Sequence, residues 1–121
     1  MDVLTARSEL IDLLRDSLGS TVRVYDALDA RVDPPGIMVS LPELEWDAAF
    51  VEPTSALFQV AYIVKFDNRA TESLLAAVSK VSDAIDHPDM VITRASTGSW
   101  SSSEGSGLPS YNFTVSVALS Y

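Results

Sequence analysis

Residues 111–121 alternate between apolar and small polar side chains without interruption. One set of alternate positions holds only aromatic and aliphatic residues: Tyr111, Phe113, Val115, Val117, Leu119 and Tyr121. The other set holds Asn112, Thr114, Ser116, Ala118 and Ser120. Because successive side chains of a β-strand point to opposite faces, this period of two predicts a half-buried strand. Terminal segments fray unless they are tied into the fold, so we expect this strand to be part of the core.

Two other segments have the period of a helix. In residues 3–18 apolar side chains recur every three or four positions, with Asp2 placed to cap the start and Gly19 to follow the end. A second apolar stripe predicts a helix over about residues 69–86, with Asp67-Asn68 as its N-cap. Its members are Leu74, Val78, Val81 and Ile85.

The rest of the chain predicts further strands and two irregular stretches. We expect strands at 21–25, 37–41, 54–66 and 90–95, the third with an apolar face formed by Ala56, Phe58, Val60, Tyr62, Val64 and Phe66. Glu43–Pro53 fits either an edge strand or an arm, and the Ser- and Gly-rich segment Ser96–Ser110 predicts a long loop. This order indicates a single α+β domain over 1–121, with one mixed, mainly antiparallel sheet and two helices packed on one face.

Composition limits the classes of partner. The 121 residues include 17 acidic and eight basic side chains, for a net charge of -9, and the basic residues form no run. This balance argues against a basic surface that binds nucleic acid. There is no cysteine, which excludes disulfides and thiolate metal sites. We expect a soluble protein made in the cytosol, because neither a signal peptide nor an apolar stretch of membrane-spanning length is visible.

No segment carries a catalytic signature. His87 lies near Asp83, Asp86 and Asp89, but this spacing is not that of a metal site and fits a helix C-terminus better. Asp26, Asp29 and Asp33 lack the spacing of a calcium loop. The segments 98–102 and 105–107 match neither a nucleophile turn nor a phosphate loop. We therefore expect no enzyme, no metal and no cofactor.

Three aromatic residues fall in the irregular stretches, outside the periodic core: Trp46, Phe50 and Trp100. Aromatic side chains on loops are candidate interface anchors. They can equally fold back and cover the core, and the sequence leaves both interpretations open.

The whole layout resembles the tail terminator, or tail-completion, proteins of long-tailed bacteriophages. The features that match are the helix V-L-T-A-R-S-E-L-I-D-L-L-R-D-S-L, the strands T-V-R-V-Y, I-M-V-S-L-P and A-L-F-Q-V-A-Y-I-V-K-F, and the helix A-T-E-S-L-L-A-A-V-S-K-V-S-D-A-I. A further strand, a polar loop ending in L-P and the strand Y-N-F-T-V-S-V-A-L-S-Y complete the pattern. The likeness covers nearly the full length and is one of order, not of a motif.

This resemblance implies a structural virion protein at the head-proximal end of the tail. Such proteins form a homo-hexameric ring that ends polymerisation of the tail tube protein and joins a head-completion or neck protein, while DNA passes through the lumen without sequence-specific binding. The resemblance implies no enzymatic step and no membrane contact. Within it, we expect Glu43–Pro53 and Ser96–Ser110 to contact neighbouring subunits or the adjoining ring, with Trp46, Phe50, Trp100 and Glu104 as candidate interface residues. We also expect the acidic excess to line or flank the lumen.

Other classes stay open. Another connector or neck ring protein, or a minor tail-tube subunit, would have the same size and sheet. A small ligand-binding module of ferredoxin-like layout would instead be a dimer with an apolar pocket.

Overall fold

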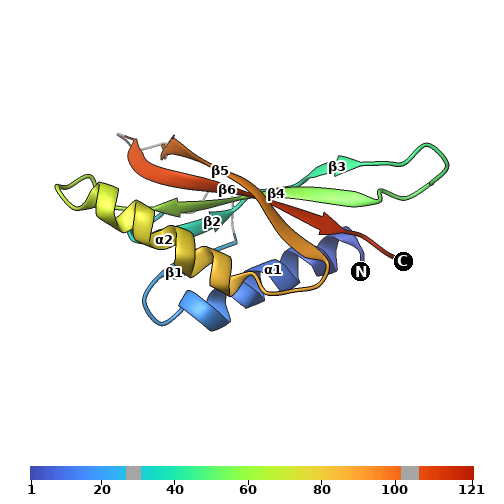
Figure 1. Cartoon of the computed structure of the whole chain (residues 1–121), viewed down its shortest axis with the longest axis horizontal. Helices are drawn as coiled ribbons and strands as arrows, with labels where there is room; N and C mark the ends of the chain where they lie inside the picture. Colours follow the sequence, from blue (N-terminus) through green and yellow to red (C-terminus); the bar gives the residue numbers. More distant parts are fainter. Residues whose placement is uncertain (27–30, 102–106) are drawn as a thin grey trace.

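The computed structural model describes residues 1–26, 31–101 and 107–121. In that part of the chain it has two helices and six strands (Figure 1). In chain order they are α1 (Val3–Leu18), β1 (Arg23–Tyr25), β2 (Gly36–Val39), β3 (Glu43–Glu45), β4 (Ser55–Ile63), α2 (Ala70–Ala84), β5 (Met90–Trp100) and β6 (Leu108–Ala118). The predicted α+β class is confirmed.

The strands form one mixed sheet in the order β1-β2-β4-β6-β5, with β3 also paired to β4. Among the strands of the described residues, only β1 and β2 run parallel, and the other pairings are antiparallel. The last strand, β6, pairs with β4 from Ser55↔Ala118 to Ile63↔Ser110 and with β5 on its other side. The expectation of a core strand near the end of the sequence is therefore confirmed, although it begins and ends three residues earlier than predicted.

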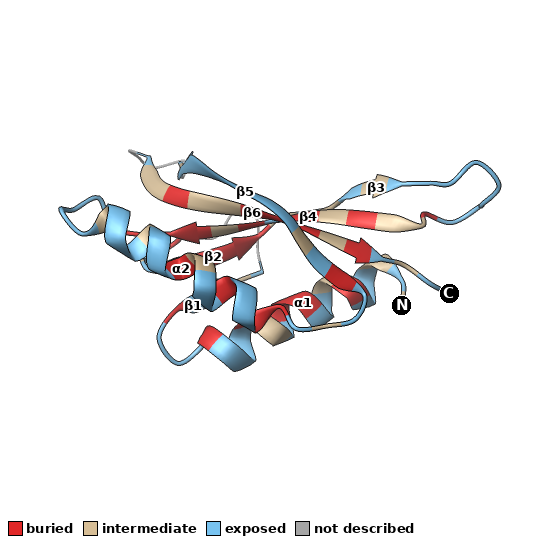
Figure 2. Ribbon diagram, in the orientation of Figure 1, coloured by how far each residue is buried: buried red, intermediate tan, exposed pale blue. Residues whose placement is uncertain are grey.

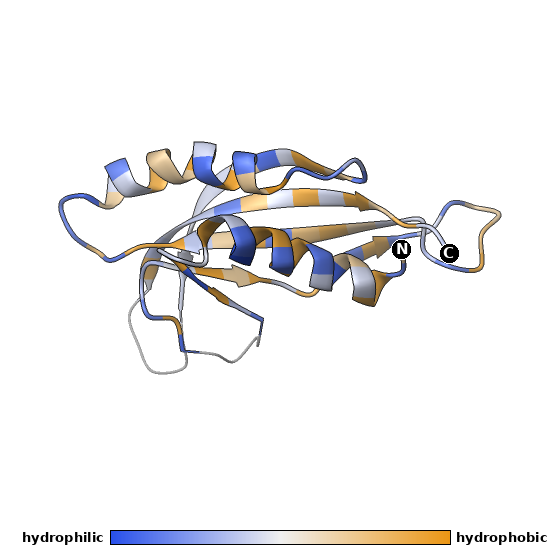
Figure 3. Cartoon of the chain, turned by 90° about the horizontal axis from the view of Figure 1, so that it is seen from below, coloured by the Kyte–Doolittle hydropathy of each residue, from blue (hydrophilic) through white to orange (hydrophobic). Residues whose placement is uncertain are grey.

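Both helices bury their apolar stripes against the same face of this sheet. Alternate residues of β4 and β6 belong to one core cluster together with side chains of α1 and α2, and strand residues two apart share a face. Figure 3, from the helix side, shows the two helices lying along the sheet. The cluster includes Leu10, Leu14, Ala77, Val81, Phe58, Val60, Phe113 and Val115.

The ends of three elements differ from the sequence prediction. Phe66 was expected on the apolar face of β4, but β4 ends at Ile63 and Phe66 is 84% exposed in the turn that follows. Asp67 does not cap α2: its carboxylate accepts from the backbone N of Arg69 (2.9 Å), before the helix begins. Gly19 follows α1 in a right-handed conformation, so no left-handed cap forms there. The cap by Asp2 is confirmed, since its carboxylate accepts from the backbone N of Thr5 (2.8 Å).

The prediction of a loop over Ser96–Ser110 is wrong. β5 continues to Trp100 and β6 begins at Leu108, so that residues 96–100 pair with residues 108–112. Serine and glycine indicate a loop by composition, but β6 supplies a partner for their backbone, and such pairing overrides weak strand preference. The connection between the two strands shortens to residues 101–107.

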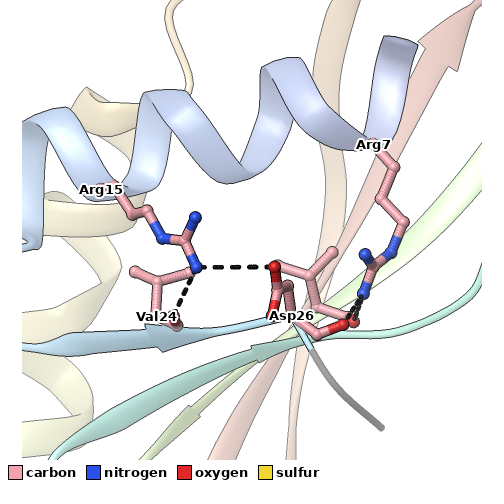
Figure 4. A network of polar contacts seen from close by, with 5 residues as sticks. Arg7, Arg15, Val24 and Asp26 are labelled. Atoms are coloured by element: carbon pink, nitrogen blue, oxygen red, sulfur yellow. Dashed lines mark hydrogen bonds and ion pairs between the residues drawn. The ribbon is translucent and has the colours of Figure 1, made fainter. Parts of the chain in front are cut away.

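Arg7 joins α1 to the sheet where β1 has ended (Figure 4). Its guanidinium donates to the carbonyls of Val39 (2.8 Å), Ser40 (3.3 Å) and Asp26 (2.9 Å). About two turns further along α1, Arg15 donates to the carbonyl of Val24 (3.3 Å) and forms an ion pair with the Asp26 carboxylate (3.7 Å). β1 pairs with β2 only as far as Met38, so Arg7 supplies the donors that a longer neighbouring strand would have provided.

β2 and β3 lie end to end along one edge of β4, separated by residues 40–42. Ser40 extends the first ladder, because its backbone N donates to the Gln59 carbonyl (3.0 Å) and its hydroxyl accepts from the Gln59 backbone N (2.9 Å). Pro42 has no N–H to offer the ladder. The chain then resumes pairing as β3, which leads outward to the connection with β4.

Candidate assembly surfaces

The connection between β3 and β4, residues 46–54, projects beyond the body at one end of the long axis (Figure 1). We call it the arm. Three of its large apolar side chains are exposed: Trp46 (54%), Phe50 (61%) and Val51 (93%). Large apolar groups gathered on a short exposed segment are typical of a contact surface.

Internal hydrogen bonds give the arm a defined shape. The indole Nε1 of Trp46 donates to the Val51 carbonyl (3.2 Å), and the backbone N of Thr54 donates to the Glu45 carbonyl (2.8 Å). At its base, the hydroxyl of Tyr121 donates to the Pro53 carbonyl (2.9 Å). Burial, and then the charges of Glu52 and Asp2, raise the pKa of Tyr121, so this hydroxyl keeps its proton and its hydrogen bond at neutral pH. The prediction of an edge strand or an arm for 43–53 thus resolves into both: three residues of strand, then the arm.

The arm and β3 are acidic. Glu43, Glu45, Asp47 and Glu52 lie within ten residues, and none of them pairs with a cation of the described chain. Because the register pairs Glu43 with Leu57 and Glu45 with Ser55, the two β3 carboxylates point to the sheet face away from the helices. This end of the molecule therefore combines unpaired negative charge with exposed aromatic groups.

The predicted interface residues do not all come together. Trp46 and Phe50 share the arm, whereas Trp100 lies at the end of β5 and packs beside Leu108 against Val32, Met38 and Ile63. Trp100 is half-buried, and its Nε1 finds no acceptor among the described residues. For Trp100 the structure therefore supports the interpretation in which the aromatic ring covers the core. Glu104 lies outside the described residues.

The sheet face away from the helices carries no helix in the described structure (Figure 1). We call it the open face. Many of its central positions hold uncharged polar side chains, and Arg94 lies opposite Thr114 on the same face. Val32, Met38 and Ile63 form a small cluster near the β1 end. Figure 2 shows that β5, at the edge of the sheet, is largely exposed. The central polar positions are Gln59, Ser96, Asn112, Thr114 and Ser116.

The basic residues are dispersed along the sequence, but three of them line one cleft in the structure. Lys65, Arg69 and Lys80 surround a hollow between the start of α2 and the segment before β1, and Tyr62, Val22 and Val64 also line it. We call it the basic cleft. The spacing of Arg69, Ser73, Ala76 and Lys80, in steps of four, three and four, places them on one face of a helix and could have indicated the grouping. The sequence does not reveal that Thr21 and Pro35 lie against that face, because they are distant from α2 along the chain.

His87 and Asp26, which were considered as metal ligands, use their side chains in structural contacts. The Nδ1 atom of His87 accepts from the backbone N of Asp89 (3.1 Å) just after α2. The carboxylate of Asp26 pairs with Arg15, and the backbone N of Asp33 donates to the Tyr25 hydroxyl (3.0 Å); Asp29 lies outside the described residues. Within residues 1–26, 31–101 and 107–121, no group of three acidic, histidine or cysteine side chains is placed to hold a metal ion. In the same ranges no helix is long and apolar enough to span a membrane.

The fold and these surfaces define the chain as an α+β domain with one helix-covered sheet face, one open face and a projecting acidic arm. No protein-family model and no curated protein matches the chain.

Proposed function

We propose that this chain is a structural protein of a phage tail, which forms a ring at the head-proximal end of the tail tube, stops its polymerisation and joins it to the head or neck. The observation that carries the proposal is the arm, an ordered projection whose Trp46, Phe50 and Val51 side chains are exposed. A ring needs a surface that contacts the next copy and another that contacts the adjoining ring. The arm and the open face supply two separate surfaces on one small domain.

The open face suits a position beside a moving polyanion. Its central side chains are mostly polar and uncharged, with Arg94 as a single cation opposite Thr114, and the chain as a whole carries a net charge of -9. Such a surface offers no cluster of cations to the phosphates of DNA, so DNA would pass without being held. In this arrangement the open face of each copy faces the lumen and the two helices face outward.

The test is to add the purified chain to growing tail tubes. We expect shorter tubes of narrower length distribution, and negative-stain images with added density at one end only. The matched variant replaces Phe50 and Val51 by serine, which removes exposed apolar surface without touching the core. It should fold normally and cap fewer tubes. Unchanged tube lengths and bare ends with the natural chain would contradict the proposal, and density spaced along the tube would favour a tube subunit.

A further inference from the structure

The basic cleft is lined by a tyrosine hydroxyl that has no hydrogen-bond partner in the described chain. Tyr62 is 4% exposed and its ring packs in the main core, yet its hydroxyl group makes no hydrogen bond within the described chain. The hydroxyl is not among the fully enclosed polar atoms that lack a partner in the described chain, so it opens toward the cleft that Tyr62 lines. Burial raises the pKa of Tyr62, so the group stays protonated at neutral pH and is available as a donor. An acceptor on a molecule that enters the cleft would complete this site.

The rim of the cleft favours an anion. Lys65, Arg69 and Lys80 outnumber the two carboxylates that also line it, Asp67 and Glu72. None of the three cations lies within ion-pair distance of a carboxylate of the described chain. The cleft is therefore locally positive, and its cations are not neutralised by ion pairs, although the chain as a whole has a net charge of -9.

An exposed aromatic ring lies next to the cleft. Phe66 is 84% exposed and stands between two lining residues, Lys65 and Asp67. The cleft and its border thus present three features together: cations, a tyrosine hydroxyl that can donate, and an apolar ring. A matching partner would carry carboxylates interspersed with apolar side chains.

The arm of a second copy has this composition. It places the carboxylates of Asp47 and Glu52 beside the exposed Trp46, Phe50 and Val51, and β3 adds Glu43 and Glu45. The arm and the turn before α2 lie at opposite ends of the long axis (Figure 1), so a chain cannot insert its arm into its own cleft. Contact between two different surfaces is heterologous, and repeated contacts of this kind produce rings or filaments.

We propose that the acidic arm of one copy docks in the basic cleft of the next copy, with an arm carboxylate accepting a hydrogen bond from the Tyr62 hydroxyl. The arm aromatics then pack beside Phe66. This inference deepens the proposed ring, on which it rests for its biological setting, and it assigns the contact between adjacent subunits. The contact itself is testable without any tail tube.

Cysteine pairing tests the contact directly, because the natural chain contains no cysteine. Val51→Cys labels the arm and Phe66→Cys labels the border of the cleft, and neither change alters a charge. When the two variants are mixed at equal concentration under mild oxidation, with one carrying a mass tag, we expect mixed dimers well above their statistical share. The matched control replaces Phe66→Cys with Ser8→Cys, an exposed position on α1 whose change also leaves the charge unaltered, and should give only the statistical share. Statistical pairing of Val51→Cys with Phe66→Cys would overturn the proposal.

Charge exchange tests the chemistry of the same contact. Lys65→Glu, Arg69→Glu and Lys80→Glu, combined in the Phe66→Cys chain, should abolish the excess of mixed dimers. Glu43→Lys, Glu45→Lys and Asp47→Lys, combined in the Val51→Cys chain, should restore it with that partner. Tyr62→Phe in the Phe66→Cys chain should weaken association about tenfold, the effect of losing one hydrogen bond to a charged group. Failure of the exchanged charges to restore pairing would count against the arm as the occupant.

The outcomes separate this contact from the proposed function. Cross-linking with no effect on tail tubes would keep the contact and remove the tail role. Normal capping with statistical cross-linking would keep the tail role and remove the contact.

Discussion

The side chains of Gln59 and Thr114 bond to one another across the centre of the open face. They are directly opposed in the β4–β6 register, and the Thr114 hydroxyl both accepts from Nε2 of Gln59 (3.0 Å) and donates to Oε1 (3.2 Å). Because β4 and β6 are central strands, this pair places two bonded polar side chains at the middle of the open face. The hydrogen bonds between the two side chains thus favour the observed register of β4 with β6.

We predict that Gln59 and Thr114 are energetically coupled. In a double-mutant cycle with Gln59→Ala and Thr114→Val, the double variant should lose less free energy of unfolding than the sum of the singles, by about 0.5–1 kcal/mol. Urea denaturation of the four chains measures the coupling. Additive losses would show that the bond contributes nothing beyond its separate side chains.

Arg7 should matter more than an exposed residue of the same helix. Arg7→Ala removes the donors of three carbonyls between α1 and the sheet, and we expect it to cost about 1.5–3 kcal/mol of unfolding free energy, as for hydrogen bonds to a charged group. Glu9→Ala, on the exposed side of α1, should stay within about 0.5 kcal/mol of the natural chain. Equal losses for the two variants, measured by urea denaturation, would remove the assigned role of Arg7.

Two phenylalanines should differ sharply in their effect on stability. Phe113→Ala opens a cavity in the main core and should cost about 3–5 kcal/mol, because Phe113 is almost fully buried. Phe66→Ala should change the thermal midpoint little, since its ring is exposed. Thermal unfolding followed by circular dichroism measures both, and a large loss for Phe66→Ala would mean that its ring packs on the body in solution.

Tyr62 should make the fold sensitive to alkaline pH. Burial raises the pKa of its hydroxyl above the ordinary tyrosine value of 10.0, so above that pH the unfolded chain releases a proton that the folded chain retains. Stability from this group is complete below the unfolded pKa and is lost as the pH rises through the folded pKa. The unfolding free energy should fall more between about pH 9 and pH 11 for the natural chain than for Tyr62→Phe. Identical pH profiles would show that Tyr62 titrates alike in both states.

Trp100 should tolerate loss of its nitrogen but not of its ring. Trp100→Phe removes a buried donor that has no acceptor among the described residues, so it should be neutral or slightly stabilising. Trp100→Ala exposes the cluster of Val32, Met38 and Ile63 and should cost about 1–3 kcal/mol. Urea denaturation compares the two, and a marked loss for Trp100→Phe would point to an unseen acceptor.

The elements that local periodicity encodes were predictable. The stripe of α1 with its Asp2 cap, and the alternation in β6, depend on residues close in sequence, so their existence follows from pattern alone. The extension of β5 to Trp100 was not predictable in this way, because its Ser and Gly residues are ordered only by the opposing strand. Pairing partners distant in sequence leave no local signal.

The candidate site was predictable only in part. The sequence marked Trp46 and Phe50 as aromatic residues outside the periodic core, and both are exposed on the arm. It did not reveal that the Tyr62 hydroxyl reaches a cleft, since that depends on the approach of α2 to the segment before β1. Composition likewise could not separate Trp100, which packs on a cluster, from the exposed arm aromatics.

The nine-residue pairing of β4 with β6 has a geometric consequence for assembly. β4 begins at Ser55 beside the arm and ends at Ile63 beside the basic cleft, so a single strand pair of roughly 30 Å separates the two surfaces. In an arm-to-cleft ring, the twist accumulated along these strands contributes to the rotation from one copy to the next. The number of copies that close such a circle would then depend on the sheet interior as well as on the contact itself, through side chains that never touch a neighbouring subunit.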